Sequence, residues 1–268
     1  MAQPEDITHD SLLGGKVILR QHAAGYRVAM DPVLLAASVP ATDGETVLDV
    51  GTGVGAAMLC LATRVPGIRV TGVEVQRELA HLAAENIAEN GLTERVEVMV
   101  SDLQRPPPPR LVPRSFNHVM ANPPYFEAGR VRASGKDEKA TANIEGSGGL
   151  EAWTAYCLGM ARPGGTITII HRTDRLTELL ALLTGKAGDL VIFPLWPHQP
   201  FNENGGAADN METFPGQSPI AAKRVIVRAV AGAKGPLRMA AGLVLHKANG
   251  DHTKAADFVL RNGGRLML

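Results

Sequence analysis

Residues 46–55, which read TVLDVGTGVG, decide the fold of this chain. The apolar, β-branched first half of this stretch predicts a short buried strand. Three glycines follow at alternate positions: Gly51, Gly53 and Gly55. The run 56–64 then predicts a helix. This order of strand, glycine loop and helix lets the backbone approach a nucleotide-like ligand closely, because glycine adopts positive φ and carries no side chain.

Strands and helices alternate along the chain beyond this stretch. We predict further strands at 68–75, 96–101, 116–121, 166–171 and 190–196. The predicted connecting helices lie at 76–90, 150–161 and 174–184. Such alternation is typical of a parallel sheet with helices on both faces. The sequence therefore predicts an α/β fold with a Rossmann-like, doubly wound and mostly parallel sheet.

Two smaller features flank the predicted sheet. Runs 16–21 and 26–30 predict an N-terminal β-hairpin, followed by a helix that Asp31 caps with a proline at its first position. Runs 224–230 and 237–246 predict an antiparallel hairpin at the C-terminal edge of the sheet. We expect residues 1–40 to form an N-terminal appendage. Residues 41–268 then form the main domain, with a helix at 253–261 and a long polar loop at 198–219.

Composition limits the classes to which the protein can belong. The 268 residues carry no net charge, with 27 basic and 27 acidic side chains. No apolar run approaches the roughly 20 residues of a membrane span, and the first residues lack a signal-peptide pattern. Cys60 and Cys157 lie in apolar helical patterns without metal-ligand spacing. We therefore expect a cytoplasmic protein with reduced thiols, no membrane contact and no metal.

Acidic residues stand at the ends of three successive predicted strands: Asp49, Glu74 and Asp102. Read as Gly51-x-Gly53-x-x-Ala56 with Glu74 downstream, the pattern also fits a dinucleotide fingerprint, in which the acid binds a ribose hydroxyl. The third acid separates the two possibilities, because a carboxylate there can accept the exocyclic amine of a bound adenine. A nicotinamide dinucleotide and a second adenine-bearing ligand are thus the two candidates, and the dinucleotide is the weaker.

An Asn-Pro-Pro-Tyr run, residues 122–125, follows the strand predicted at 116–121. Neither proline can donate a backbone hydrogen bond, so the Asn122 amide oxygen and the Pro123 carbonyl present two acceptors side by side. They can hold both hydrogens of a planar amine, such as the exocyclic amine of adenine or a glutamine side-chain amide. Tyr125 can stack on the group that carries the amine. The catalytic candidates are therefore Asn122, Pro123 and Tyr125, with no catalytic histidine.

These motifs together resemble the class I S-adenosylmethionine-dependent methyltransferases. The resemblance implies that the glycine loop meets the methionine part of the cofactor. It further implies that Glu74 holds the ribose, that Asp102 meets the adenine and that Asn122 lies against the cofactor as well as the target amine. S-adenosylhomocysteine would be the product.

A narrower resemblance is to the adenine-N6 methyltransferases that modify the anticodon loop of a valine tRNA. It rests on Leu12-Leu13-Gly14-Gly15, Gln21, Gly25-Tyr26-Arg27, Asp31-x-x-Leu34-Leu35, residues 222–227 and the strand 243–246. This resemblance implies a methyl transfer to adenine N6 in structured RNA, with Gln21 and Asp31 among the cofactor-binding residues. Asn-Pro-Pro-Tyr also resembles the methyltransferases of release-factor glutamine, so a protein glutamine or a small molecule stays an alternative acceptor.

Basic residues gather in two parts of the sequence. Lys223, Arg224 and Lys247 belong to a C-terminal segment that is rich in basic residues, and Arg130 and Lys136 follow the Asn-Pro-Pro-Tyr run. Local positive charge attracts phosphates even on a neutral protein. We expect these residues to contact RNA. A non-catalytic RNA-binding module is the alternative from another class of function.

Overall fold

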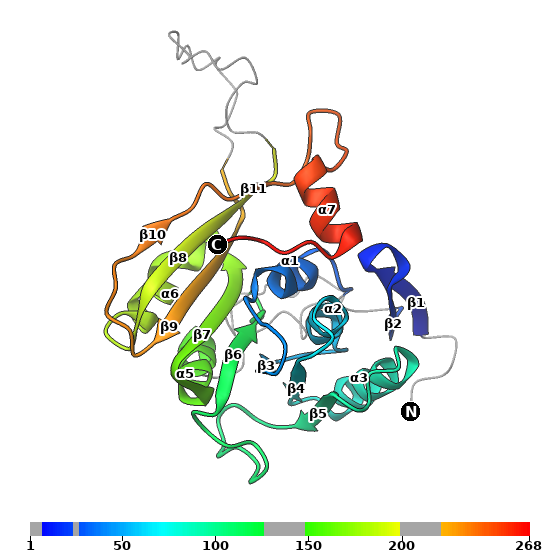
Figure 1. Cartoon of the computed structure of the whole chain (residues 1–268), viewed down its shortest axis with the longest axis horizontal. Helices are drawn as coiled ribbons and strands as arrows, with labels where there is room; N and C mark the ends of the chain where they lie inside the picture. The colour runs from blue at the N-terminus through cyan, green and yellow to red at the C-terminus, as the bar shows by residue number, and fades with distance from the viewer. Residues whose placement is uncertain (1–6, 24–26, 126–147, 199–220) are drawn as a thin grey trace, which may run out of the picture.

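The computed structural model describes residues 7–23, 27–125, 148–198 and 221–268. Its central sheet has the strand order β10-β8-β9-β7-β6-β3-β4-β5, with β11 paired to β8 (Figure 1). Five neighbouring strands run parallel: β3 (Thr46–Val50), β4 (Arg69–Glu74), β5 (Val96–Val100), β6 (Phe116–Ala121) and β7 (Ala161–Arg172). The prediction of an α/β fold with a mostly parallel sheet is confirmed.

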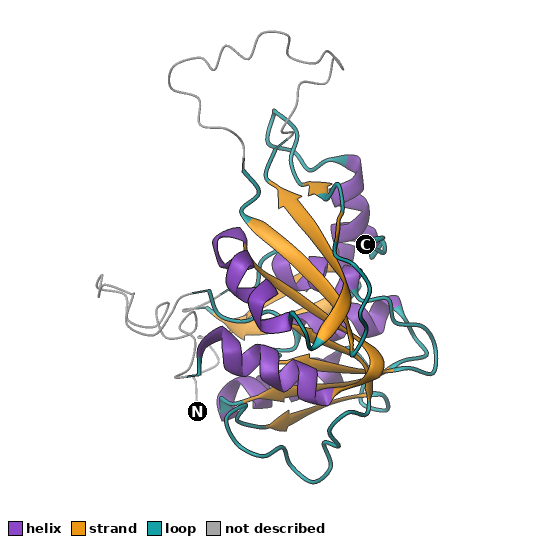
Figure 2. Ribbon diagram, turned by 90° about the vertical axis from the view of Figure 1, so that its left-hand side faces the viewer, coloured by secondary structure: helices purple, strands orange, loops and turns teal. Residues whose placement is uncertain are grey.

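Helices cover both faces of the sheet (Figure 2). On one face, α1 (Asp31–Ser38), α2 (Ala56–Arg64) and α3 (Arg77–Glu89) share an apolar core. On the other face lie α5 (Gly149–Met160) and α6 (Leu176–Leu183). Side chains of β6 alternate between the two cores, since Met120 packs into the first and Val119 and Ala121 into the second. Strands buried on both faces explain the continuous apolar runs of the sequence. Within the described ranges, no helix has the length and apolar character that a membrane span requires.

The predicted C-terminal hairpin is wrong in its pairing. β9 (Arg224–Ala231) lies inside the sheet, antiparallel to both β7 and β8 (Ala187–Trp196). The run 237–246 instead holds two short strands that pair parallel with β8, namely β10 (Arg238–Met239) and β11 (Leu243–Val244). The centre of β9 is buried on both faces, with Val225, Ile226 and Val227 at most 1% exposed, and this favours an interior position. The expectation of antiparallel pairing in this part of the sheet is confirmed.

The N-terminal β-hairpin exists, but its strands differ from the prediction. β1 (Ile7–Leu12) pairs antiparallel with β2 (Val17–His22), and residues 27–30 form no strand. The turn η2 (Leu13–Gly15) includes two glycines at φ +66° and +93°, which allow the chain to reverse. Asn86 of α3 and Asn90, the residue that caps the end of α3, then bind the other edge of β2. Asn86 and Asn90 each accept a hydrogen bond from a β2 amide and donate one to the carbonyl of the same residue, Arg20 and Ile18 respectively.

The helix predicted at Asp31 is present, although Asp31 does not cap it. α1 begins at Asp31 and its N-cap, Met30, makes no side-chain capping bond. The last helix, α7 (Lys254–Asn262), is capped by Thr253, whose hydroxyl accepts from the Ala256 amide at 3.1 Å. The long polar loop predicted at 198–219 lies outside the described residues, apart from His198.

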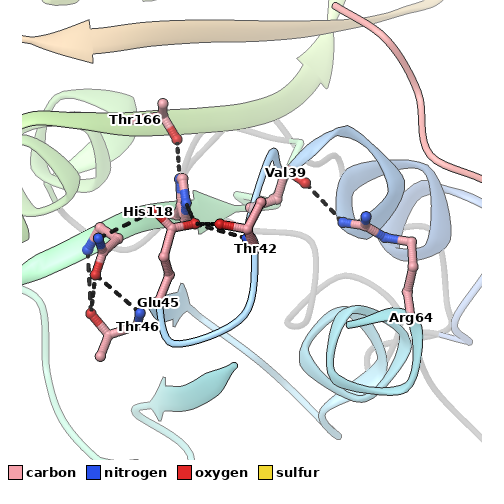
Figure 3. Close-up of polar contacts among 8 residues, drawn as sticks. Val39, Thr42, Glu45, Thr46, Arg64, His118 and Thr166 are labelled. Atoms are coloured by element: carbon pink, nitrogen blue, oxygen red, sulfur yellow. Dashed lines mark hydrogen bonds and ion pairs between the residues drawn. The ribbon is translucent and has the colours of Figure 1, made fainter. Parts of the chain in front are cut away.

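A polar network lies near the amino ends of the parallel strands (Figure 3). The two ring nitrogens of His118 lie 2.7 Å from the Thr166 hydroxyl and 2.9 Å from Glu45 Oε2. The same Glu45 oxygen accepts from the backbone and the hydroxyl of Thr42, at 2.8 and 2.9 Å. His118 therefore serves the stability of the sheet at the end opposite to the glycine loop.

Candidate active site

The four polar residues predicted at strand ends come together at one edge of the sheet. β6, β3, β4 and β5 are adjacent and parallel, so their carboxyl ends meet. Asp49 lies one residue before the end of β3, Glu74 ends β4, and Asp102 and Asn122 follow β5 and β6. The order of strands reverses between β3 and β6, which is where open α/β sheets bind their ligands.

The glycine loop is fixed by backbone bonds to the neighbouring strand. The amides of Gly51 and Thr52 both donate to the Val73 carbonyl, at 2.8 and 3.0 Å. Gly53 has φ +56°, and a Cβ added to it would meet no atom within 4 Å. The next helix, α2, begins after Gly55, which is also left-handed at φ +93°. The loop thus presents open backbone next to the amino end of a helix.

Gly51 lies against a tryptophan that the sequence did not indicate. A Cβ on Gly51 would lie 2.1 Å from Cη2 of Trp153 and 2.6 Å from Cζ3. Trp153 belongs to α5, about 100 residues away along the chain, and its pattern there is that of an ordinary packed helix. The indole therefore packs directly against the glycine loop. Its ring occupies the space that a side chain at position 51 would need, which is one reason why this position requires glycine.

Asp49 is a buried carboxyl group at the base of this loop. It is 2% exposed, and its Oδ2 accepts a hydrogen bond of 2.7 Å from the Thr52 hydroxyl. Burial raises the pKa of Asp49 to about 7, although hydrogen bonds from Thr52 and the Met58 amide act to lower it. A cation held nearby favours the ionised form, so this position suits a positively charged ligand.

Glu74 binds the loop as well as ending β4. Its two oxygens accept from the amides of Gly53 and Gln76, each at 2.9 Å. The carboxyl is 6% exposed, and burial raises its pKa despite these bonds. An ionised carboxylate offers about four lone-pair positions, so acceptor capacity is left for a ligand hydroxyl.

Asp102 and Val75 add a carboxylate and an apolar side chain to the same edge of the sheet. The Asp102 side chain is 38% exposed, accepts from the Gln104 amide at 2.9 Å and lies 3.4 Å from Arg105 Nε. Val75, directly after Glu74, is an apolar side chain that is 57% exposed. Val75 was not among the predicted site residues, although an apolar residue between a strand-end acid and a helix start was a usable signal. An exposed apolar side chain beside a carboxylate suits a flat heterocycle with an amino group.

The Asn-Pro-Pro-Tyr segment is held by residues from distant parts of the chain. The Tyr125 hydroxyl lies 3.1 Å from Asn122 Oδ1 and donates a short hydrogen bond to Asp31 Oδ2. Arg224 donates to the same Asp31 oxygen at 3.0 Å, and its guanidinium carbon lies 4.3 Å from the centre of the Tyr125 ring. The ring also forms a T-shaped pair with His171, with ring centres 5.6 Å apart. Asp31 and Arg224 are thus linked to Tyr125.

Comparison with known proteins identifies the part of the chain that carries these features. Residues 27–141 match the model of a family described as the methyltransferase small domain. The match includes the glycine loop, all three strand-end acids and Asn-Pro-Pro-Tyr.

Relatives of this chain include two proteins named tRNA1(Val) (adenine(37)-N6)-methyltransferase. The one from Shewanella halifaxensis is 31% identical over 160 residues, which are 60% of this chain and 63% of the relative. The one from Aeromonas hydrophila is 33% identical over 159 residues, or 58% and 64%. The alignment therefore spans less than two thirds of either relative.

A solved structure extends the similarity to most of the chain. A predicted O-methyltransferase from Agrobacterium tumefaciens superposes with a TM-score of 0.67 at 26% identity, covering 89% of this chain and 98% of that chain. A SAM-dependent O-methyltransferase from Thermotoga maritima shares the fold with a TM-score of 0.52 at 18% identity, over 79% and 68% of the two chains.

Other predicted residues lie away from the strand-end site or have other partners. Gln21 is 2% exposed, and both polar groups of its side-chain amide bind other parts of the chain. Its nitrogen donates to Asp10 at 2.6 Å, and its oxygen accepts from the Val28 amide at 2.9 Å. Lys223 and Lys247 are exposed. Arg130 and Lys136 lie outside the described residues.

Proposed function

We propose that this chain transfers a methyl group from S-adenosylmethionine to the exocyclic N6 of an adenine in structured RNA, most specifically tRNA. The observation that carries the proposal is the placement of Asn122 beside the glycine loop, across the adjacent strands β3 and β6. The proposal of RNA as the substrate is supported by the names of the two relatives. Because tRNA is a cytoplasmic substrate, we place the protein in the cytoplasm.

The residues at the sheet edge suit S-adenosylmethionine. The ligand carries an ammonium and a sulfonium charge, and the buried carboxyl group of Asp49 is a partner for such charge. The buried carboxyl group of Glu74 has acceptor capacity left for the ribose hydroxyls. The open backbone at Gly53 leaves room for the methionine part. Val75 offers an apolar surface for the adenine ring, and Asp102 an acceptor for its amine. Bound there, the cofactor supplies an activated methyl group.

The remaining task of the chain is to present the amine. The lone pair of adenine N6 is delocalised into its ring, so the nitrogen is a poor nucleophile. Acceptors at Asn122 Oδ1 and the Pro123 carbonyl hold both hydrogens at about 2.9 Å and favour a pyramidal nitrogen. Tyr125 stacks on the base, which contributes on the order of 1–3 kcal/mol. Alignment of the amine nitrogen, methyl carbon and sulfur can lower the activation barrier by about 7 kcal/mol at best. The transfer requires no general base before the amine attacks. The base must leave its stack, which is easiest in a loop.

The decisive experiment incubates the protein with labelled S-adenosylmethionine and total tRNA from a strain that lacks it, followed by nucleoside mass spectrometry. We expect label in N6-methyladenosine. Replacement of Asn122 by alanine should reduce transfer by roughly 100-fold or more, by analogy with the loss of one positioned hydrogen-bonding group. Cofactor binding measured by calorimetry should stay within about threefold of wild type.

Asn249→Ala serves as the matched control. Asn249 is exposed and bonds only Asp251 in the described structure, so its loss should leave transfer unchanged. Equal turnover by Asn122→Ala and wild type would refute the proposal. Label in a release factor and none in tRNA would establish the glutamine alternative. A protein that binds RNA without binding the cofactor would be the non-catalytic module.

A further inference from the structure

We propose that Asp31, held by Arg224, is a positioning residue that draws the single hydroxyl hydrogen of Tyr125 away from Asn122. This inference rests on the proposed function and adds two residues to its machinery. In it, Asp31 does not bind the cofactor. It keeps the Asn122 amide oxygen available as an acceptor for the substrate amine.

The geometry joins four residues from three distant segments. Asp31 opens α1, Asn122 and Tyr125 follow β6, and Arg224 opens β9. The Tyr125 hydroxyl lies within hydrogen-bond distance of two acceptors, Asp31 Oδ2 and Asn122 Oδ1. Arg224 contacts both Asp31 and Tyr125, because its Nε donates to the carboxylate while its guanidinium lies over the ring. These contacts span 94 and 193 residues of sequence.

A phenol has one hydrogen to donate, so only one of the two acceptors can receive it at a time. A carboxylate is the stronger acceptor, and hydrogen bonds to charged groups are roughly twice as strong as neutral ones. The hydrogen therefore goes to Asp31, and Asn122 Oδ1 is not occupied by Tyr125.

Loss of Asp31 reverses this preference. Without the carboxylate, Asn122 Oδ1 at 3.1 Å is an acceptor within reach of the Tyr125 hydroxyl. The hydroxyl then takes one of the two lone pairs of that oxygen, which makes the oxygen a weaker acceptor for the substrate amine and crowds its approach. A phenylalanine at 125 would keep the ring for stacking but could not compete. The effect of losing Asp31 should thus depend on the hydroxyl of residue 125.

The experiment compares four proteins: wild type, Asp31→Ala, Tyr125→Phe and the double variant. We expect Asp31→Ala to lower kcat by about 10- to 100-fold, the scale of one misdirected hydrogen bond. In the Tyr125→Phe background, the same substitution should cost less than about threefold. KM and the calorimetric Kd for S-adenosylmethionine should stay within about threefold in all four proteins. Asp257→Ala, which removes an exposed carboxylate paired with Arg261, controls for a general loss of charge.

Other outcomes overturn the inference. An equal loss of kcat in both backgrounds would make the role of Asp31 structural. A large rise in the cofactor Kd would make Asp31 a cofactor ligand, as the sequence analysis expected. Thermal unfolding of each variant separates both outcomes from misfolding.

A further measurement does not depend on the substrate. If wild type methylates no RNA, the proposed function fails, and the hydroxyl proton of Tyr125 still tests the hydrogen bond. We expect a slowly exchanging hydroxyl proton resonance in wild type that is absent in Tyr125→Phe and displaced in Asp31→Ala. If wild type shows no such resonance, the inference is refuted.

Discussion

Gly51 and Gly53 offer a quantitative test of how the glycine loop is built. Both have positive φ, +69° and +56°, so alanine at either position carries the cost of a left-handed residue, about 1 kcal/mol. Only Gly51 faces an obstacle, since its Cβ would lie 2.1 Å from Cη2 of Trp153, whereas nothing lies within 4 Å at Gly53. Overpacking of this kind costs about 1–3 kcal/mol more. We therefore expect Gly51→Ala to destabilise the protein by about 2–4 kcal/mol and Gly53→Ala by about 1 kcal/mol.

The assay is urea unfolding followed by far-ultraviolet circular dichroism, which does not depend on tryptophan. Trp153→Leu vacates the space next to Gly51 at its own cost in stability. In that background, Gly51→Ala should cost only the backbone part, about 1 kcal/mol, so the two substitutions couple by about 1–3 kcal/mol. Equal losses at Gly51 and Gly53, or strict additivity between Gly51→Ala and Trp153→Leu, would refute the reasoning that Trp153 is the obstacle.

Two further predictions concern charge. Burial alone would raise the pKa of Glu45, but bonds from His118 and Thr42 outweigh it and hold the pKa at about 2. Because its pKa is depressed, the ionised Glu45 carboxylate contributes fully to stability above pH 4.5, the ordinary pKa of the group. This contribution is lost as the pH falls from 4.5 to about 2. Glu45→Gln should lower the free energy of unfolding at neutral pH by on the order of 2–3 kcal/mol and reduce its dependence on pH in this window. An unchanged dependence of stability on pH would contradict this prediction. Replacing Lys223 and Lys247 by glutamine should weaken tRNA binding and reduce its salt slope by about 2, measured by filter binding, and unchanged affinity would move the RNA surface elsewhere.

The succession of elements could be predicted because local patterns decide it. The strand Thr46–Val50 and the helix Ala56–Arg64 have the predicted bounds, since apolar runs and glycines mark them within a few residues. The pairing of strands depends on contacts that no local pattern encodes. Val17–His22 pairs with Ile7–Leu12 instead of residues 26–30, and Arg224–Ala231 enters the sheet between β7 and β8.

The site likewise contains residues whose position local patterns predict and residues whose partners depend on contacts between distant segments. Asp49, Glu74, Asp102 and Asn122 were predicted to share one edge because the ends of parallel strands do so in any such sheet. The partners of Asp31 and Gln21 were not foreseen. An Asp at a helix start reads as a cap in sequence, and only the fold reveals Tyr125 and Arg224 beside it. The roles assigned to these residues in binding and catalysis stay predictions.

The two halves of the site differ in how they are held, and this difference determines what each can do. The half where we propose that the cofactor binds is held largely by backbone bonds, such as those from the amides of Gly51 and Thr52 to the Val73 carbonyl, with the Glu74 side chain as a further partner of the loop. The acceptor half depends on side chains that converge on Tyr125 from α1 and β9. Backbone bonds between adjacent strands survive most substitutions, whereas a cluster of side chains changes with a single one. Change at Asp31 or Arg224 can therefore alter the presentation of the target amine without disturbing the cofactor.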